Sequence, residues 1–295
     1  MKAYEFEVWD VFTERRFAGN PLAVLMDARG LGEEDMQRIA REFNLSETTF
    51  VLPPDDPAHA ARVRIFAPGY ELPFAGHPTV GTALAIAQSR KLTGALALEL
   101  TAGLFPVTLD MDGPAPHATF ENPNAPEEHG AAPAADKIEK ALTLPAGSLD
   151  REAHRPRIFG AGVDYLYAKA PLDVVRRAKL DSAAFTALNL GKIVGVFLYA
   201  EGGDEPQADY HARMFAPGAS VPEDPATGSA ACALPGQIAA AGALSDGAHS
   251  WLVEQGFEMG RPSRIEVAFG AQQGAAGRVR IGGAAVRVSE GRIRL

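Results

Sequence analysis

Glu47 is the side chain of this sequence that is best suited to acid–base chemistry. It lies in a β-rich run at residues 45–52 (LSETTFVL), and side chains alternate between the two faces of a strand. Both faces would carry apolar residues, so the carboxyl group would be partly removed from water whichever way it points. Such removal raises the pKa of a carboxyl group toward neutrality, where it can both donate and accept a proton. Judged from the strand alone, the alternative is an exposed glutamate on an edge strand.

His77 and Asp224 each stand directly before a proline in a loop that leads into a helix. His77 could donate a hydrogen bond to a substrate or act as a second acid or base, and it could equally brace its loop. The sequence Asp224-Pro225 is typical of a helix start with Asp as the N-cap, and capping alone would account for the aspartate. We interpret Asn20 as a turn residue rather than as a polar site residue.

Glycine and serine at the start of two helices favour the binding of an anion. Gly76 precedes one helix, and Gly228 and Ser229 precede the other. Free backbone N–H groups and the positive end of the helix dipole together attract anions. The two helix starts could therefore hold a substrate carboxylate without an arginine or a lysine. The alternative is that the glycines only allow helices and strands to pack closely.

Other common catalytic centres are not indicated. The sequence has no G-x-S-x-G elbow, no P-loop and no H-E-x-x-H motif. Its seven histidines are scattered without the spacing of metal ligands. The run Gly160-Ala161-Gly162 lacks the third glycine of a dinucleotide-binding fingerprint. We therefore expect neither a metal nor a cofactor.

A hexapeptide repeat indicates that the elements carrying these residues are duplicated. RIFAPG at residues 64–69 recurs as RMFAPG at residues 213–218, which is 149 positions later. Each copy is followed by a proline-containing loop and a small-residue helix start, Gly-Thr-Ala at 81–83 and Gly-Ser-Ala at 228–230. A repeat of this length predicts two related domains rather than a solenoid, and clefts at domain interfaces are common ligand sites.

Hydrophobic periodicity predicts a mixture of strands and helices in both halves. In the first half we expect strands at 4–13, 22–26, 45–52, 61–67, 96–100 and 105–111, with helices at 32–43 and 79–89. In the second half we expect helices at 136–144 and 230–243, with strands at 165–168, 193–200, 251–255, 264–269, 279–282 and 284–288. The Pro/Ala/Glu-rich segment 122–135 is interpreted as a linker.

Composition restricts the partners and the compartment. The 295 residues carry a net charge of −9, which disfavours nucleic acid and anionic membrane surfaces but leaves a small anionic substrate possible. Cys232 is the single cysteine, so an intrachain disulfide cannot form, which suits a reducing cytosol. No signal peptide and no apolar run long enough to cross a bilayer are evident, so we expect a soluble, cytoplasmic protein.

Several segments of the chain resemble, in order, the phenazine-biosynthesis isomerase-like family. The matching segments are 10–13 (DVFT), 17–21 (FAGNP), 45–50 (LSETTF), 71–79 (ELPFAGHPT), 223–230 (EDPATGSA), 255–256 (QG) and 259–263 (MGRPS). The resemblance covers most of the chain.

This resemblance implies an α+β fold similar to that of diaminopimelate epimerase. Such a fold has two similar domains, each a curved, mostly antiparallel sheet wrapped around a central helix. The Ala-rich helices at 79–89 and 230–243 fit the central positions, because a helix that is apolar all round should be buried. We expect domains at 1–120 and 121–295, with the last strand either closing the second domain or returning to the first. Family members are often homodimers.

The resemblance also implies a carboxylate catalyst. The epimerase relatives use two cysteines, one from each half, but this sequence has Ala75-Gly76 and Pro225-Ala226 in the corresponding loops. Cys232 lies further on, inside the expected helix, so a two-thiol racemisation is excluded. In the isomerase branch the catalytic glutamate aligns with Glu47. Asp224 lies in the family's site, where it could orient a substrate amine or help to hold the proton.

The hypothesis from the sequence is a cofactor-independent isomerase that moves a proton within a small, carboxylate-bearing and possibly cyclic substrate. Glu47 would be the acid and base, with Asp224 and His77 assisting. The amides of Gly76 and Gly228 and the Ser229 side chain would bind the substrate carboxylate. The main alternative is a binding or regulatory protein that holds a small acid without converting it. A third possibility is a different lyase or epimerase on the same scaffold.

Overall fold

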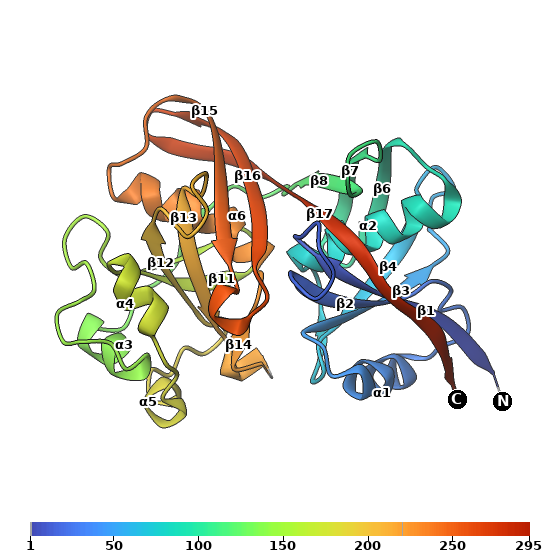
Figure 1. Cartoon of the computed structure of the whole chain (residues 1–295), viewed down its shortest axis with the longest axis horizontal. Coiled ribbons are helices and arrows are strands. Elements are labelled where there is room, and N and C mark those ends of the chain that lie inside the picture. The colour runs from blue at the N-terminus through green and yellow to red at the C-terminus, as the bar shows by residue number, and fades with distance from the viewer. Residues whose placement is uncertain (1, 220) are drawn as a thin grey trace. The chain divides into compact units, whose positions relative to one another are not determined.

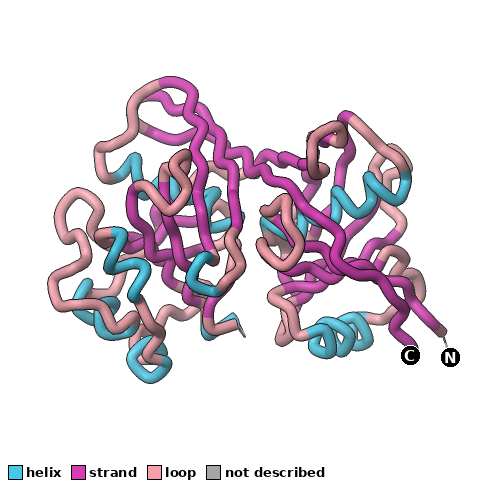
Figure 2. Tube along the Cα trace, viewed as in Figure 1, coloured by secondary structure: helices cyan, strands magenta, loops and turns pink. Residues whose placement is uncertain are grey.

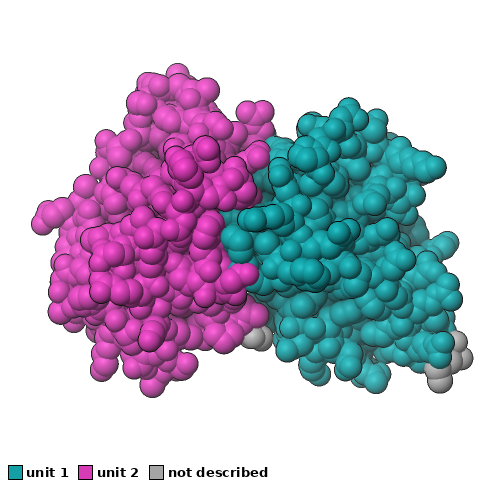
Figure 3. Space-filling model, viewed as in Figure 1, with its two compact units in different colours: residues 1–121, 261–263, 282–295 teal, residues 122–260, 264–281 magenta. Residues whose placement is uncertain are grey.

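The computed structural model describes residues 2–219 and 221–295 as helices and strands that fall into two compact units (Figure 1). Unit 1 comprises Met1–Glu121, Arg261–Ser263 and Gly282–Leu295, and unit 2 comprises Asn122–Gly260 and Arg264–Ile281 (Figure 3). Compared with a single division after residue 120, the structure adds a three-residue segment and the end of the last strand to unit 1.

Unit 1 is a sheet with two helices (Figure 2), and most of its strand pairs are antiparallel. Its elements are β1 (Ala3–Val11), β2 (Asn20–Leu25), α1 (Glu33–Phe43), β3 (Glu47–Leu52), β4 (Ala61–Phe66), β5 (Glu71–Leu72), α2 (Gly76–Arg90), β6 (Gly94–Leu100), β7 (Gly103–Asp110), β8 (His117–Glu121) and the second part of β17 (Ala275–Arg294). The pairs β2–β3 and β4–β6 are parallel, whereas β1–β2, β1–β17, β3–β4, β4–β5, β6–β7 and β7–β8 are antiparallel.

Helix α2 is the central helix of unit 1. Its residues 76–87 are all buried, and it contacts β1, β2, β3, β6, β7 and β8. A Cβ at Gly81 would lie 2.6 Å from a methyl group of Val11 and 2.7 Å from one of Leu22, so a larger residue here would require these side chains to shift. The helix begins at Gly76, three residues before the predicted start. The proline at position 78 lies in the first turn, where N–H groups have no partner within the helix, so its missing N–H costs nothing there.

Strand β3 lies between the two helices of unit 1. Phe50 packs with Met36 and Ile39 of α1 in one apolar cluster, so the even-numbered side chains face α1. Thr49 accepts a hydrogen bond from Thr82 of α2, so the odd-numbered side chains face α2. Because side chains alternate along a strand, Glu47 is on the α2 face.

Unit 2 contains the remaining elements and a second buried helix. They are β9 (Glu127–Glu128), α3 (Ala135–Ala141), β10 (Arg157–Gly160), β11 (Asp164–Lys169), α4 (Leu172–Arg177), α5 (Ser182–Thr186), β12 (Val196–Glu201), β13 (Tyr210–Phe215), η1 (Pro217–Ala219), β14 (Glu223–Asp224), α6 (Gly228–Ala240), β15 (Gly247–Gln255), η2 (Phe257–Met259), β16 (Ser263–Gln272) and the first part of β17. Helix α6 is buried from Gly228 to Ile238 and contacts β9, β10 and β11. Helices α3, α4 and α5 contribute to a separate apolar cluster.

The two units repeat the same order of strand pairings. Parallel β2–β3, antiparallel β3–β4, antiparallel β4–β5 and parallel β4–β6 in unit 1 match β11–β12, β12–β13, β13–β14 and β13–β15 in unit 2. The repeated hexapeptide falls on β4 and β13. The predicted equivalence of residues 81–83 with 228–230 is wrong, because the matching helices begin at Gly76 and Gly228. The connection in unit 2 is therefore three residues longer.

Two predicted segments differ from the observed elements. The strands expected at 279–282 and 284–288 are parts of the single strand β17, which continues through Gly282 and Gly283. The expected linker at 122–135 contains the short strand β9, which pairs with β10. Among the residues that the structure describes, no helix is both long enough and apolar enough to cross a membrane.

Candidate active site

Glu47 and His77 lie against each other near the start of α2. Glu47 is the first residue of β3, and His77 is the second residue of α2. The Glu47 Oε2 and His77 Nε2 atoms are 3.3 Å apart, and the two side chains are 16% and 4% exposed. Two of the residues named from the sequence are therefore brought into contact within unit 1, in a setting that largely excludes water.

The Asn20 side chain holds the other ring nitrogen of His77. Its Nδ2 atom lies 3.1 Å from His77 Nδ1, and Asn20 is fully buried. An amide nitrogen donates, so Nδ1 accepts and the neutral ring carries its proton on Nε2, facing Glu47. The interpretation of Asn20 as a turn residue is wrong, because Asn20 opens β2 and pairs with Val11. The sequence offered no signal for this role, since the contact depends on the fold.

His77 is a neutral imidazole at physiological pH. Burial lowers its pKa to about 3, because the interior disfavours the charged ring. Although the distance to Glu47 is that of an ion pair, the neutral ring fits both the burial and the hydrogen bond that Nδ1 accepts from Asn20. The site therefore contains a carboxylate facing a neutral N–H donor.

Hydroxyl groups fix the register of β3 against α2 beside this contact. Thr82 Oγ1 donates to Thr49 Oγ1 at 2.8 Å, and Thr49 Oγ1 donates to the Ala23 carbonyl at 3.4 Å. Both threonines are buried. Since Thr49 is two residues from Glu47 on the same strand face, these bonds restrict the position of the catalytic candidate relative to the helix.

Arg261 clamps the loop that ends at Asn20. Its guanidinium group donates to the Gly19 carbonyl at 2.8 Å and pairs with the buried Asp10 carboxylate. The Gly19 N–H in turn donates to the Pro262 carbonyl at 3.0 Å. Gly19 has a φ of 65° and no room for a Cβ, which would lie 2.3 Å from a backbone oxygen. The segment at 259–263, noted from the sequence only as a family signature, thus supports the position of Asn20.

Tyr70 adds a phenol close to the carboxylate. Its side chain belongs to the loop between β4 and β5, and the residue is 40% exposed. Partial burial and the negative charge of Glu47 both raise the pKa of Tyr70. Tyr70 was not named from the sequence, where it is one of six tyrosines without a distinguishing motif.

Asp224 belongs to a polar cluster in unit 2. Its carboxylate accepts from Thr227 Oγ1 at 2.6 Å, and its carbonyl accepts from Gln255 Nε2 at 2.7 Å. The Gln255 side chain also accepts from the Thr227 N–H at 3.1 Å. The N-cap prediction for Asp224 is wrong, because β14 pairs Asp224 with Met214 and the N-cap position falls on Thr227.

Ser229 occupies the same helical position in unit 2 that His77 occupies in unit 1. Each is the second residue of its helix. Ser229 is 8% exposed, and its Oγ lies 2.7 Å from the hydroxyl of Tyr165. Gly76 and Gly228 are the first residues of α2 and α6, and neither helix has a side-chain N-cap hydrogen bond. The side chains at the N-cap positions, Ala75 and Thr227, therefore do not cap the amides at these helix starts, which favours the binding of an anion there.

One group of described side chains has the residue types of a metal site. Ligand atoms of Asp204, His211 and Glu254 in unit 2 lie within 4.8 Å of one another. His211 Nδ1, however, is 2.5 Å from Glu254, and His211 Nε2 is 2.9 Å from Glu258. A ring that donates from both nitrogens has no lone pair for a metal, so this group is an ion-paired cluster.

Cys232 lies inside α6 and is fully buried. Burial raises the pKa of its thiol to about 12, which leaves almost no thiolate at neutral pH. The cysteine is therefore a packing residue of the central helix.

Similarity to known proteins agrees with the fold. A family model described as phenazine biosynthesis-like protein matches residues 9–291. The chain belongs to this family. It is 42% identical over 301 residues to an uncharacterized isomerase of Mesorhizobium japonicum, covering 99% of both proteins. It is 36% identical to the trans-2,3-dihydro-3-hydroxyanthranilate isomerase of Pseudomonas aeruginosa, covering 98% of this chain and 99% of that protein.

Solved structures show the same relationship. A phenazine biosynthesis protein of the PhzF family from Bacillus anthracis has a TM-score of 0.89 and 27% identity, with 100% of both chains covered. A hydroxyproline epimerase from Agrobacterium vitis has a TM-score of 0.69 at 15% identity, covers 99% of this chain and 91% of its own, and shares the fold alone. The predicted α+β, diaminopimelate epimerase-like fold is confirmed. As a phenazine biosynthesis-like protein with relatives named isomerases, the chain is an isomerase of this family.

Proposed function

We propose that this isomerase moves a proton between two carbon atoms of a small carboxylate-bearing substrate, with Glu47 as acid and base. The observation that carries the proposal is the Glu47 carboxylate facing the buried, neutral His77 ring at 3.3 Å. The carboxylate is 16% exposed and lies beside a neutral N–H donor, so it is held in a setting from which water is largely excluded and in which it can transfer a proton to and from a bound substrate.

The reaction needs no oxidant and no cofactor. Glu47 removes a proton from a carbon next to an electron-withdrawing group, so a C–H bond breaks and a carboxyl O–H bond forms. The electron pair spreads over the conjugated system of the substrate. Glu47 then returns the proton to another carbon of that system, which shifts the double bond and restores the carboxylate.

His77 supports this step as a neutral hydrogen-bond donor. The Asn20 contact at Nδ1 keeps the proton on Nε2, where it can stabilise the Glu47 carboxylate or an oxygen of the substrate. Its low pKa makes proton release from an imidazolium a poor source of acid at neutral pH.

Binding of the substrate carboxylate is assigned to the helix starts. Gly76 and Gly228 carry the first N–H groups of α2 and α6, and the Ser229 Oγ belongs to the next residue after Gly228. Asp224 is assigned to orient a substrate amine, because the amine N–H can donate a hydrogen bond to the carboxylate. A compound with both groups on one ring is the first substrate to test, and trans-2,3-dihydro-3-hydroxyanthranilate, named for the Pseudomonas aeruginosa relative, is such a compound.

Proton NMR in D₂O tests the proposal. The wild-type protein is incubated with trans-2,3-dihydro-3-hydroxyanthranilate and with a panel of small cyclic amino and hydroxy acids, and deuterium entering carbon positions is recorded. We expect exchange and a double-bond shift for the wild type and loss of both for Glu47→Gln. Glu34→Gln, at an exposed glutamate of α1, is the matched control.

Two results would contradict the proposal. Full turnover by Glu47→Gln would remove Glu47 from the chemistry. Binding of a small acid without any exchange in the wild type would favour a binding or regulatory protein instead. We also propose a homodimer, as the family resemblance implies, which sedimentation of the whole chain would test.

A further inference from the structure

An arginine and a glutamate form the same forked pair in each unit. Arg64 donates from Nε to Glu71 Oε1 at 2.7 Å and from Nη2 to Glu71 Oε2 at 2.5 Å. Arg213 donates from Nε to Glu223 Oε1 at 2.8 Å and from Nη2 to Glu223 Oε2 at 2.9 Å. A two-point contact of this kind fixes both the distance and the orientation of the partners, which a single ion pair does not.

The rest of the surroundings repeats as well. The guanidinium carbon lies 5.1 Å from the ring centre of Phe66 in unit 1 and 4.8 Å from that of Phe215 in unit 2. These phenylalanines pair across the strand ladder with Glu71 and Glu223. Each arginine is thus held between an aromatic face and a carboxylate at the same step of the same pair of strands.

The spacing to the helix start is constant, whereas the spacing inside the pair is not. Seven positions separate Arg64 from Glu71, and ten separate Arg213 from Glu223. From each glutamate, however, the helix begins five positions later, at Gly76 or Gly228. The difference in loop length therefore lies between the arginine and the glutamate of each pair. The segment from the glutamate to the helix start has the same length in both units.

That short segment carries the residues of the proposed site. In unit 1 it ends at Gly76 and is followed by His77. In unit 2 Asp224 is the first residue after the glutamate, the segment ends at Gly228, and Ser229 follows. A displacement of either glutamate would move these groups, because only a few residues lie between.

We propose that Arg64–Glu71 and Arg213–Glu223 are equivalent positioning pairs, each setting the loop and helix start of its own unit for the proton transfer. The inference rests on the proposed function for its catalytic consequence. None of the four side chains is assigned to touch the substrate; they act through the backbone of residues 72–77 and 224–229.

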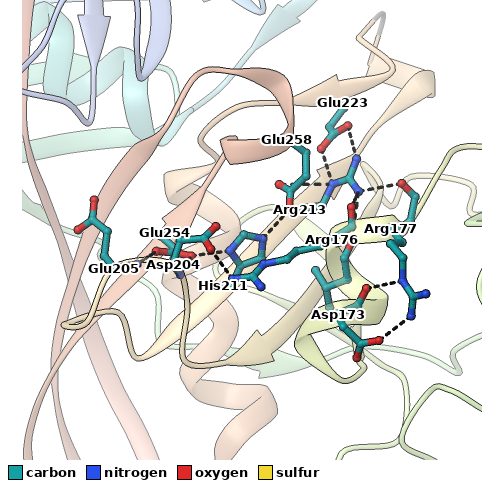
Figure 4. A network of polar contacts seen from close by, with 12 residues as sticks. Asp173, Arg176, Arg177, Asp204, Glu205, His211, Arg213, Glu223, Glu254 and Glu258 are labelled. Carbon is teal, nitrogen blue, oxygen red and sulfur yellow. Dashed lines mark hydrogen bonds and ion pairs between the residues drawn. The ribbon is translucent and has the colours of Figure 1, made fainter.

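The pair in unit 2 is the more firmly held. Arg213 Nη1 donates to the carbonyls of Val175, Arg176 and Ala178 at the end of α4, at 3.2, 3.2 and 2.7 Å. Figure 4 shows Arg213 between Glu223 and Glu258. The Arg213 and Glu223 side chains are 7% and 17% exposed.

The pair in unit 1 is more open to solvent. Arg64 and Glu71 are 23% and 26% exposed, and the additional partner Glu33 is 73% exposed. Water screens such charges, so the Arg64 pair should hold its loop less strongly. Changes at Arg213 are therefore expected to have the larger effect.

Hydrogen–deuterium exchange of the whole chain tests the positioning role without requiring turnover. Arg213→Lys keeps the charge but removes the fork, and it should speed exchange of amides in 224–229 by about tenfold while leaving 72–77 unchanged. Arg64→Lys should produce the reverse pattern with a smaller increase. Glu223→Gln serves as a second variant at the buried pair. Arg29→Lys breaks an exposed forked pair with Asp27 and should change neither loop.

Turnover supplies the second measurement. If trans-2,3-dihydro-3-hydroxyanthranilate is converted, Arg213→Lys should lower kcat by about tenfold or more with a smaller change in KM, because positioning acts on the chemical step. Equal acceleration of exchange throughout the chain, or no change in 224–229, would overturn the inference even in an active enzyme. A wild type that shows no turnover, together with the local exchange pattern, would instead count against the proposed function alone.

Discussion

Glu47 and Gly195 occupy equivalent positions in the two units. In each unit the next residue along the chain pairs with the phenylalanine of the repeated hexapeptide, Phe66 or Phe215. A Cβ at Gly195 would lie 2.2 Å from the Phe215 carbonyl oxygen, so the duplicate of the catalytic candidate cannot carry even a methyl group. The carboxylate on β3 thus has no counterpart in unit 2.

The second acid is equally unmatched. Asp224 pairs with Met214 in unit 2, and the same ladder position in unit 1 is Leu72, which pairs with Ile65. The scaffold is duplicated, but the acids are not related by the duplication. A mechanism with one equivalent acid or base from each unit has no matched groups at these positions. This asymmetry favours a reaction in which one carboxylate both removes and returns the proton.

The first prediction concerns the equivalent of Glu47. Gly195→Ala should lower the free energy of unfolding by about 1–3 kcal/mol, because the methyl group must displace backbone. Urea unfolding followed by circular dichroism measures this change. Gly270→Ala is the control, since a Cβ there would meet no atom within 4 Å. Equal stability of both variants would show that unit 2 has room for a side chain at this position.

The second prediction concerns the tautomer of His77. In Asn20→Asp the carboxylate beside Nδ1 can only accept, so the proton should move to Nδ1 or the ring should become charged. Either change removes the arrangement of a neutral Nε2–H facing Glu47, and turnover should fall by about tenfold to a hundredfold.

Nitrogen-15 NMR of the histidine rings measures this change directly. The wild type should show a protonated Nε2 and an unprotonated Nδ1 at His77. Asn44→Asp, at an exposed helix end, should leave the spectrum of His77 unchanged. An unaltered tautomer in Asn20→Asp would mean that Asn20 does not set the proton position.

The sequence was sufficient for elements whose pattern is long and local. The amphipathic helix predicted at 32–43 is observed as Glu33–Phe43, and the two apolar helices are the buried α2 and α6. Short elements such as β14, with two residues, were missed because they exist only through pairing with a partner strand.

The site shows the same limit. Glu47 and His77 could be named from their residue types and from the family resemblance, but their contact joins a strand to a helix 30 positions later in the chain. From the sequence, Asn20 was interpreted as a turn residue rather than as a polar site residue, and Arg261 was noted only within a family segment, because the importance of both lies in what they touch. The Arg261 side chain reaches the Gly19 carbonyl across 242 positions of sequence, and no local pattern records such a contact.

The third prediction is that the folded chain loses stability as the pH falls, because of His77. The unfolded His77 ring takes a proton near pH 6.5, whereas the folded ring resists it until about pH 3. Between these values the unfolded state binds more protons, so stability falls as the pH falls, by up to about 1.4 kcal/mol per pH unit from this group. Urea titrations at several pH values should show a shallower slope for His77→Asn. An unchanged slope would place the acid sensitivity in other groups.

The fourth prediction concerns the single thiol. Because burial raises the pKa of Cys232 to about 12, a chromogenic disulfide reagent should not react with the native chain at about pH 8. One equivalent of thiol should react after unfolding in denaturant, which serves as the internal control. Rapid reaction of the native protein would show that α6 opens far more easily than its burial implies.

The fifth prediction is that the folded chain loses stability as the pH rises above neutrality, because of His211. Burial alone would lower the pKa of this ring, but hydrogen bonds to Glu254 and Glu258 outweigh it and raise the pKa to about 9. Since the folded pKa lies above the unfolded value of 6.5, the stabilisation is fully present below pH 6.5 and is lost as the pH rises through about 9. The free energy of unfolding should therefore decline across this window.

His211→Gln separates this effect from the rest of the chain. The variant leaves the buried Glu254 carboxylate without its cation and Glu258 with only the more distant Arg213, so it should be less stable than the wild type at pH 6.5. Its stability should then vary less between pH 6.5 and about 9, because the titrating group is gone. His249→Gln, at a partly exposed ring that donates to a carbonyl, is the matched control and should keep the wild-type slope. A wild-type slope in His211→Gln would mean that the imidazolium between the two glutamates is not the source of the loss of stability at alkaline pH.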